Sequence, residues 1–260
     1  MSFLINPFRF EVGAIAFAPD DLSSLVLWLD AADVATITKD GSNNVSDWND
    51  KSSNEAHATQ TSSSQKPDYE SSGINSQGSL RFDGSNDELD IPGLMGITGS
   101  QNRSVFAVFQ QDHTGSDHAI ISLGTSSTRQ SYHLVVRGSD NLGVGLWADD
   151  YNSATLSPGT AAAQAAAILD GTTRGDITLY LDGSPEVATG TGVVNTANPG
   201  SSRIGSTHGF SEFDGLIAEV IVYASALSTT DRQKVEGYLA HKWGIIGSLP
   251  SGHPYKSTAP

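Results

Sequence analysis

The 260-residue sequence contains no cysteine, so it can form neither a disulfide framework nor a thiolate metal site. No apolar run approaches the ~20 residues that a membrane-spanning helix needs, and we expect no membrane partner. Basic residues are few: 14 Lys and Arg stand against 29 Asp and Glu, which gives a formal net charge of −15. Because such a surface repels phosphate backbones, we expect no nucleic-acid partner. Solubility alone is a sufficient reason for this charge.

The N-terminus also lacks the pattern of a secretory signal. Residues 1–10 have no early basic region, and Asn6, Pro7 and Arg9 interrupt their apolar stretch. We therefore expect a protein that is made and assembled in the cytoplasm.

Short strand signals fill most of the chain. Leu25 to Leu29 is a nearly continuous apolar run, which is typical of a strand buried on both faces. About a dozen such runs are separated by Gly, Asp and Asn turns, whereas the polar residues 49–65 are expected to form a long loop. This pattern predicts an all-β fold with two packed sheets.

One helix is predicted near the C-terminus. Ser228 is placed at its N-cap, and Asp231 three residues later completes a capping pattern. Val235 and Leu239 follow at helical spacing, and Gly244 supplies the stop. We expect Trp243 to anchor this helix to a sheet.

Three stretches carry a family resemblance: residues 80–92, with an Asp-Gly turn between two strands; residues 166–183, a hairpin; and residues 203–223, the last long strand. In this order, followed by the helix, they resemble the LamG-like jelly-roll domains of the concanavalin A-like lectin/glucanase superfamily. The resemblance implies a two-sheet antiparallel jelly-roll sandwich with a short C-terminal helix. It divides the chain into an N-terminal docking arm (1–21), a sandwich with its closing helix (22–245) and a C-terminal tail (246–260).

A second resemblance concerns residues 1–10, 25–33, 48–52, 237–244 and 249–255, which are similar to predicted virion proteins of tailed bacteriophages. It implies a virion structural protein, either a capsid decoration protein or a fibre component, that displays a non-catalytic lectin-like sandwich. The expected localisation is the virion, after assembly in the host cytoplasm. The expected partners are the major capsid protein or a neighbouring subunit, and a homo-oligomer is expected.

The N-terminal arm is the predicted assembly segment. An exposed apolar arm must dock on something, either a partner or its own domain. Its assembly residues are Phe3, Leu4, Ile5, Phe8 and Phe10.

An alternative function is a carbohydrate-binding module or adhesin that recognises a cell-surface glycan. A sugar site needs an aromatic platform flanked by amides and carboxylates, and one such cluster follows the strand predicted over 142–147. The cluster consists of Trp147, Asp149, Asp150, Tyr151 and Asn152. Packing of Trp147 inside the sandwich, with the acids solvating a turn, is the other interpretation.

Calcium is the one cofactor that the LamG resemblance implies, and no other cofactor is expected. Domains of that family often hold this ion with Asp side chains and loop carbonyls. The candidate ligands are Asp83, Asn86 and Asp87, although Asp and Asn also favour turns for their own hydrogen bonds.

Enzymatic chemistry is not expected. Glu88 and Asp90 share a strand face, but the third acid of a laminarinase-like motif is absent, with Pro92 and Gly93 at its possible positions. No Gly-x-Ser-x-Gly elbow accompanies the seven histidines, and no His-x-x-x-His helix is present to bind a metal.

Overall fold

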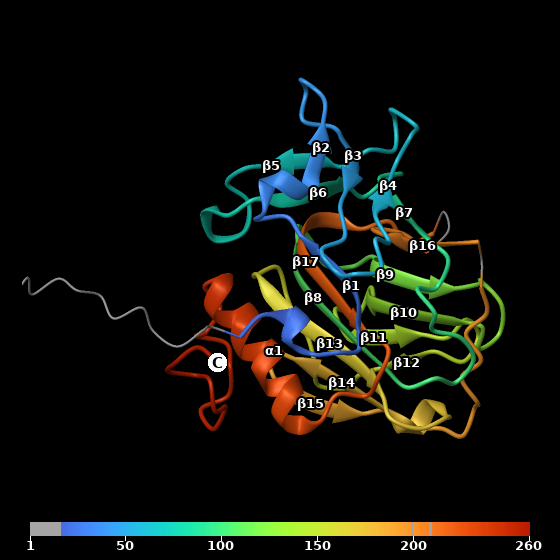
Figure 1. Cartoon of the computed structure of the whole chain (residues 1–260). Helices are drawn as coiled ribbons and strands as arrows, with labels where there is room; N and C mark the ends of the chain where they lie inside the picture. The colour runs from blue at the N-terminus through green and yellow to red at the C-terminus, as the bar shows by residue number, and fades with distance from the viewer. Residues whose placement is uncertain (1–16, 199, 208–209) are drawn as a thin grey trace, which may run out of the picture.

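Two antiparallel sheets stack face to face in the computed structural model, which describes residues 17–198, 200–207 and 210–260 (Figure 1). The eight-stranded sheet has the order β15-β14-β13-β8-β17-β6-β5, with β1 also paired to β17. Its strands are β1 (Leu25–Asp30), β5 (Asp68–Glu70), β6 (Ser79–Asp83), β8 (Arg103–Gln111), β13 (Ala163–Leu169), β14 (Ile177–Leu181), β15 (Ser184–Val187) and β17 (Asp214–Tyr223).

The nine-stranded sheet has the order β12-β11-β10-β9-β16-β7-β4-β3-β2. Its strands are β2 (Ile37–Lys39), β3 (Val45–Trp48), β4 (Ala58–Thr59), β7 (Leu89–Pro92), β9 (His118–Gly124), β10 (Ser131–Val136), β11 (Leu142–Gly145), β12 (Tyr151–Asn152) and β16 (Ser201–Ile204). The predicted all-β sandwich is therefore confirmed. The long loop expected over 49–65 is wrong in one respect, because β4 lies within it and pairs with β3 and β7.

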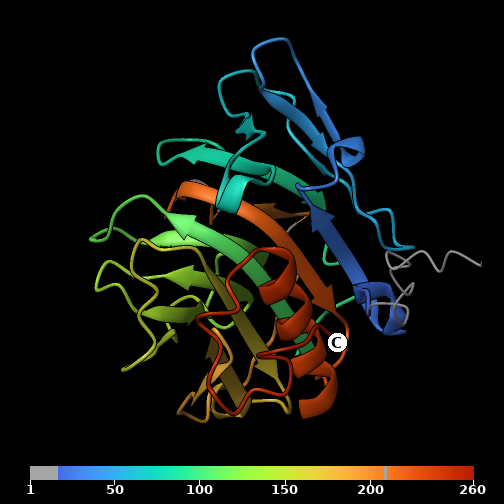
Figure 2. The same cartoon turned by 90° about the vertical axis from the view of Figure 1, so that its left-hand side faces the viewer.

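The single helix among the described residues, α1 (Thr229–Lys242), and the chain that follows it cover the outer face of the eight-stranded sheet (Figures 1 and 2). The Ser228 hydroxyl accepts a hydrogen bond from the Asp231 N–H at 3.2 Å, and Gly244 adopts a φ of 67° just past the helix, as predicted. Of the predicted tail, Leu249 and His253 are buried against this layer. The tail is therefore part of the folded unit.

The apolar run of β1 is explained by these three layers. Leu27 and Leu29 belong to the core between the sheets, whereas Trp28 belongs to the second apolar cluster beneath α1. A β-bulge in β17 between Ile217 and Glu219 turns Glu219 toward the helix as well. Both faces of the eight-stranded sheet are thus covered.

Glu219 connects the sheet to the helix. Its side chain is fully buried and accepts hydrogen bonds from two tryptophans: Trp28 Nε1 at 2.7 Å and Trp243 Nε1 at 2.6 Å. The second bond fits the expectation that Trp243 anchors the helix to a sheet. The Tyr238 hydroxyl donates at 2.9 Å, and the Lys242 ammonium lies 2.8 Å away. Lys242 also pairs with Asp30 at 2.6 Å, so one cation serves two buried carboxylates.

The assembly residues Phe3, Leu4, Ile5, Phe8 and Phe10 lie outside the described residues. The described chain begins at Phe17, whose N–H donates to the Pro260 carbonyl at 3.2 Å and whose ring lies edge-on to Tyr238. Residues 17–21 of the predicted arm therefore pack on the sandwich. No helix of the described chain is long and apolar enough to cross a membrane.

Candidate functional site

A row of polar side chains crosses the outer face of the nine-stranded sheet, opposite the face that packs in the core. Residues paired directly across neighbouring strands point to the same side of a sheet. The pairing aligns Asp47, Thr59, Asp90, Arg203, Ser122, His133 and Gly145 in this way. No helix among residues 17–198, 200–207 and 210–260 covers this face, so it is the surface on which a ligand can meet the sheet.

The chain between β16 and β17, of which the structure describes residues 205–207 and 210–213, folds back over the middle of that row. We call these described residues the 205–213 loop. The Ser122 hydroxyl donates to the Ser206 carbonyl at 2.6 Å, and the Ala119 N–H donates to the Ser211 carbonyl at 2.8 Å. Gly205 starts the loop with a φ of 84°, where a Cβ would lie 2.4 Å from the Phe82 ring, so only glycine fits. The loop separates two hollows on the outer face.

We call the first of these the Trp147 hollow; its volume is about 260 Å³. Its walls come from β10, from the turn after β11 and from the 205–213 loop. They comprise His133, Val135, Arg137, Gly145, Trp147, Ala148, Asp150, Thr207, Phe210 and Ser211.

Two aromatic rings flank this hollow. Trp147 lies beyond the end of β11 at a φ of 53°, and its ring centroid is 6.3 Å from that of Phe210, at an interplanar angle of 63°. Phe210 is 62% exposed, a large exposure for an aromatic side chain. Gly145 leaves the floor open, because a Cβ there would lie 3.0 Å from the His133 ring. Trp147 therefore belongs to the surface of the sheet, and the interpretation that it packs inside the sandwich is wrong.

Arg137 is the organising charge of the hollow. Its guanidinium donates to Asp117 at 2.9 Å, to Asp150 at 2.9 Å and to Asn152 at 3.0 Å. Asp150 uses its second oxygen to accept the Leu146 N–H at 2.7 Å. The turn that carries Trp147 is thus fixed to the residue that follows β10 by charge-assisted hydrogen bonds.

The structure brings together only part of the predicted carbohydrate cluster. Trp147 and Asp150 line the hollow, and Asn152 supports it through Arg137. Asp149 instead forms ion pairs with Arg129 at 3.0 Å and Arg174 at 2.6 Å, outside the hollow.

Tyr151 is also engaged elsewhere. Its hydroxyl donates to Glu186 of β15 at 2.8 Å, and burial, together with this carboxylate, raises the pKa of Tyr151 to about 12. It lies in the strand β12 and serves the packing of the two sheets at this end.

Of the ten lining residues, the sequence analysis named only Trp147 and Asp150. Among the eight that it missed, the three farthest from Trp147 in the sequence are Thr207, Phe210 and Ser211. They lie about 60 positions beyond Trp147, in a loop without strand or helix periodicity. The one local signal was an isolated phenylalanine between glycine and serine.

The second hollow, of about 450 Å³, is polar and has Arg203 at its centre. Arg203 binds Glu88 at 2.6 Å and Asp90 at 3.1 Å, which confirms that these two carboxylates share a face. The Ser206 hydroxyl also donates to Glu88, at 2.7 Å. One guanidinium therefore binds both acids.

The predicted calcium ligands lie at the end of β6 and in the turn that follows it. Asp83 accepts the Ser85 and Asn86 N–H groups at 2.9 and 3.2 Å, and Asp87 accepts the Asp83 N–H at 3.0 Å. Burial, followed by the nearby Asp83 charge, raises the pKa of Asp87 to about 7. Each carboxylate thus already has a structural use, and calcium binding here stays a prediction.

His113 and His118 approach each other, with ring centroids 5.2 Å apart. His118 Nδ1 accepts the Asp214 N–H at 3.1 Å, and His113 pairs with the Asp214 carboxylate at 3.0 Å. Within residues 17–198, 200–207 and 210–260, no group of three or more His, Asp or Glu residues is placed to hold a metal ion.

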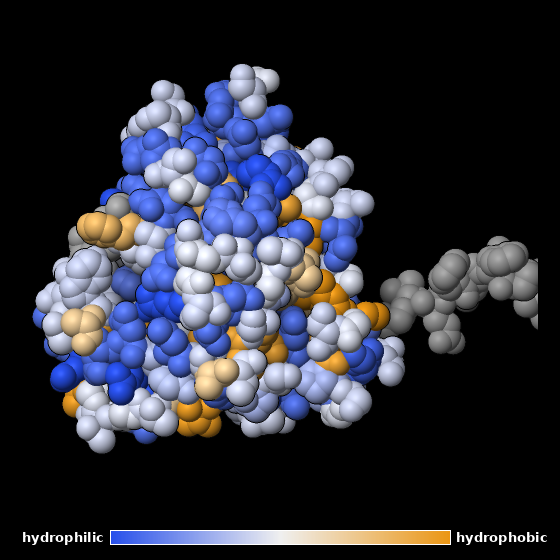
Figure 3. All heavy atoms as spheres, turned by 180° about the vertical axis from the view of Figure 1, so that it is seen from behind, coloured by the Kyte–Doolittle hydropathy of each residue, from blue (hydrophilic) through white to orange (hydrophobic). Residues whose placement is uncertain are grey.

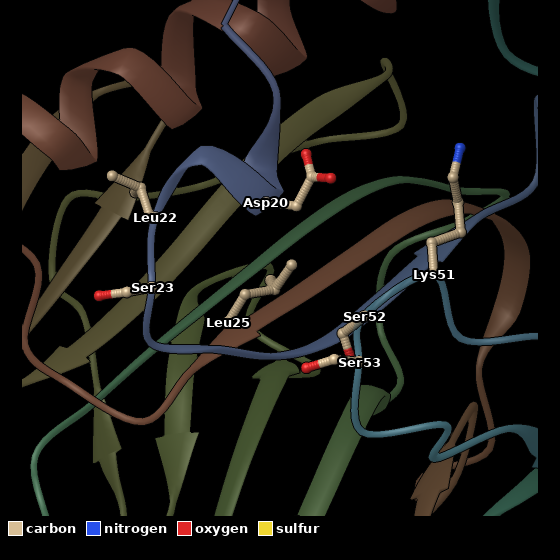
Figure 4. Close-up of a pocket in the computed structure, with 7 residues that line it drawn as sticks. All are labelled: Asp20, Leu22, Ser23, Leu25, Lys51, Ser52 and Ser53. Atoms are coloured by element: carbon tan, nitrogen blue, oxygen red, sulfur yellow. The ribbon is translucent and has the colours of Figure 1, made fainter.

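A further hollow, of about 420 Å³, lies beside the start of the described chain (Figure 4). Its one cation, Lys51, is held by Asp30 and Asp33 at 3.0 and 2.9 Å and lies over the Trp28 ring. Figure 4 shows short side chains along the remaining wall that do not converge on a common centre. With no aromatic platform, it is a weaker candidate than the Trp147 hollow.

Comparison with known proteins places this fold in a family. The family model described as the concanavalin A-like lectin/glucanases superfamily matches residues 82–231, more than half of the chain. No curated protein matches the sequence.

Solved structures share the fold at low sequence identity. Domain 4 of the arabinanase AbnA from Geobacillus stearothermophilus, solved with arabinotriose, is 18% identical with a TM-score of 0.58, over 80% of this chain and 95% of that one. A Trypanosoma rangeli sialidase is 12% identical with a TM-score of 0.57, over 85% of this chain but only 33% of that one. The binding domain of Paraclostridial Mosquitocidal Protein 1 is 11% identical with a TM-score of 0.55, over 85% of this chain and 53% of that one.

Proposed function

The chain belongs to the concanavalin A-like lectin/glucanase superfamily, and from that premise we propose that it is a non-catalytic carbohydrate-binding protein whose site is the Trp147 hollow. The observation that carries the proposal is the pair of aromatic rings, Trp147 and Phe210, beside an open, glycine-floored part of the sheet. Sugar rings stack their C–H faces on such aromatic surfaces, while neighbouring polar groups fix their hydroxyls.

The polar groups needed for orientation surround the two rings. The Thr207 hydroxyl donates to the Phe210 carbonyl at 2.7 Å, which leaves its oxygen able to accept. Ser211 and Asp150 also line the hollow. The complex of arabinanase domain 4 with arabinotriose supports carbohydrate binding as a use to which this fold is put.

Catalysis is not proposed for the Glu88 and Asp90 pair. Glycoside hydrolysis needs one carboxyl group to act as an acid and the other as a nucleophile or base, with space for the scissile bond between them. Here Arg203 lies between the two groups and binds both. We expect no turnover of glycosides by the chain and no change in this result for Glu88→Gln.

The test is a glycan array followed by titration calorimetry on the best-bound oligosaccharide. Trp147→Ala and Phe210→Ala should each weaken binding by about tenfold or more, as expected for aromatic residues at the centre of an interface. Val34→Ala, which truncates a side chain that is 59% exposed elsewhere, is the matched control and should bind as the unmodified chain does. Equal affinity of all four proteins would refute the assignment of the site.

We further propose that this sandwich is displayed on a phage virion, as a capsid decoration or fibre component. The support is the resemblance of residues 1–10 and of the segments around Trp48 and Trp243 to phage virion proteins. Residues 1–16 would dock to the major capsid protein or to a neighbouring subunit. The packing of Phe17 places the cut for a truncation after residue 16, so that the sandwich stays intact.

Light scattering tests this second proposal on the full chain and on the chain that begins at Phe17. A discrete oligomer that becomes a folded monomer on truncation supports an assembly arm. Identical monomers would refute it and favour docking of the arm on its own domain.

A further inference from the structure

The positive charge of the Trp147 hollow is poorly available to a ligand. Arg137 is the one permanently cationic side chain among the described lining residues, and only 16% of it is exposed. Three of its N–H groups are already given to Asp117, Asp150 and Asn152. An incoming anion would have to displace Asp117 or Asp150, two carboxylates of the same chain that already bind Arg137.

The carboxylates are more exposed than the cation that they bind. Asp150 and Asp117 expose 35% and 42% of their side chains, so negative charge is what this wall shows to solvent. Arg137 with these two partners carries a net charge of −1, and the whole chain carries −15. The electrostatic field of this cluster and that of the whole chain therefore both repel an anionic ligand.

The uncharged part of the hollow suits an uncharged ring. Trp147 and Phe210 offer apolar surface, and Gly145 removes the side chain that would fill the floor. Thr207 and Ser211 add hydroxyl groups, which exchange hydrogen bonds with sugar hydroxyls without requiring charge. Each of these features serves a neutral hexose or pentose as well as it serves an acidic one.

We infer that the Trp147 hollow selects neutral saccharides and discriminates against sialylated, uronic-acid and sulfated ones. This inference rests on the proposed carbohydrate-binding function and names its ligand class. A carboxylate brought beside Asp150 at contact distance in water should weaken binding by about fivefold, and more where the hollow excludes solvent.

The test uses an array in which each neutral oligosaccharide is paired with an acidic counterpart. Lactose with 3′-sialyllactose is one such pair, and arabinotriose is included as a neutral pentose chain. Calorimetry then gives the affinity ratio for each bound pair at low and at physiological salt. We expect neutral members to bind about fivefold more tightly at low salt, with a ratio that falls as salt screens the carboxylates.

Asp150→Asn is the decisive variant, because an amide can still accept the Leu146 N–H while Arg137 gains freedom to meet an anion. Its ratio of neutral to acidic affinity should fall toward one. Asp47→Asn makes the same charge change on the same sheet face, away from the hollow, and should keep the ratio of the unmodified chain.

The outcomes separate the two proposals. Tighter binding of sialylated or sulfated members by the unmodified chain overturns the inference and leaves carbohydrate binding standing. An unchanged ratio in Asp150→Asn also overturns it, because the discrimination would then not come from this wall. Absence of binding to every glycan overturns both proposals.

Discussion

Removing the Lys242 charge tests how the closing helix is held to the sandwich. In Lys242→Met the aliphatic stem is kept, so the packing of α1 changes little. Glu219, which is fully buried, then loses its cation, whereas Asp30, which is 4% exposed, loses one pair and keeps the other, with Lys51 at 3.0 Å. Breaking a buried pair from one side costs about 3–5 kcal/mol. Since 18% of Lys242 is exposed, we expect a loss near the lower limit, about 3 kcal/mol.

The loss should depend on pH in a defined direction. Burial raises the pKa of Glu219, whereas Lys242 opposes that rise. A carboxyl group with a raised pKa binds more protons in the folded state, so its contribution to stability is present at low pH and lost as pH rises. Without Lys242 the pKa of Glu219 rises further. The deficit of Lys242→Met should therefore be larger at about pH 8 than at about pH 5.

Urea unfolding followed by tryptophan fluorescence measures this loss, because Trp28 and Trp243 both contact Glu219. Lys234→Met on the same helix is the matched control: about one third of each side chain in its pair with Asp231 is exposed, so this pair should contribute little. Adding Glu219→Gln to Lys242→Met should restore part of the stability, since it removes a stranded charge. Equal stability of the two lysine variants, or a deficit that does not change with pH, would refute the reasoning.

The remaining predictions concern the Asp83–Asp87 turn. Because the folded-state pKa of Asp87 is about 7 against an ordinary 3.8, its contribution to stability is present at low pH and lost as pH rises to about 7. Asp87→Asn should thus stabilise the protein by about 1–2 kcal/mol at about pH 8, allowing for solvent screening. At about pH 4 it should change the free energy of unfolding little. Urea titrations that show no such pH dependence would contradict this. If calcium binds in this turn, millimolar calcium should raise the melting temperature of the unmodified chain but not of Asp87→Asn. Equal melting temperatures with and without calcium would exclude it.

The sequence predicted the fold well because its signals are local and agree with one another. Several elements can be predicted from a few neighbouring residues alone. Examples are the Asp-Gly turns, the alternation in β6 and β14 and the Ser228 cap. The bulge before Glu219 was beyond such reasoning, since one extra residue in a strand leaves no periodic trace. The same holds for β4, whose two residues are a strand only through their partners on β3 and β7.

The site was predicted in part, and the missing part has one physical cause. Trp147 and Asp150 were found because an aromatic residue and its polar neighbours are adjacent in the chain. Phe210 was not, because it meets Trp147 only after the 205–213 loop folds back across the sheet.

The position of that loop is set by contacts that a local pattern does not contain. Gly205 must turn with a positive φ over the Phe82 ring, and Ser122 must offer its hydroxyl from the middle of β9. Neither residue stands out from its neighbours in the sequence, because the contact that gives it this role is with a segment far away in the chain. In a binding site made from loops on a rigid sheet, the strands of the sheet can be predicted from periodicity. The loops that face the ligand cannot, because their positions depend on contacts between residues far apart in the sequence. For this chain, a glycine and a serine outside the hollow thus decide whether its second aromatic ring is in place.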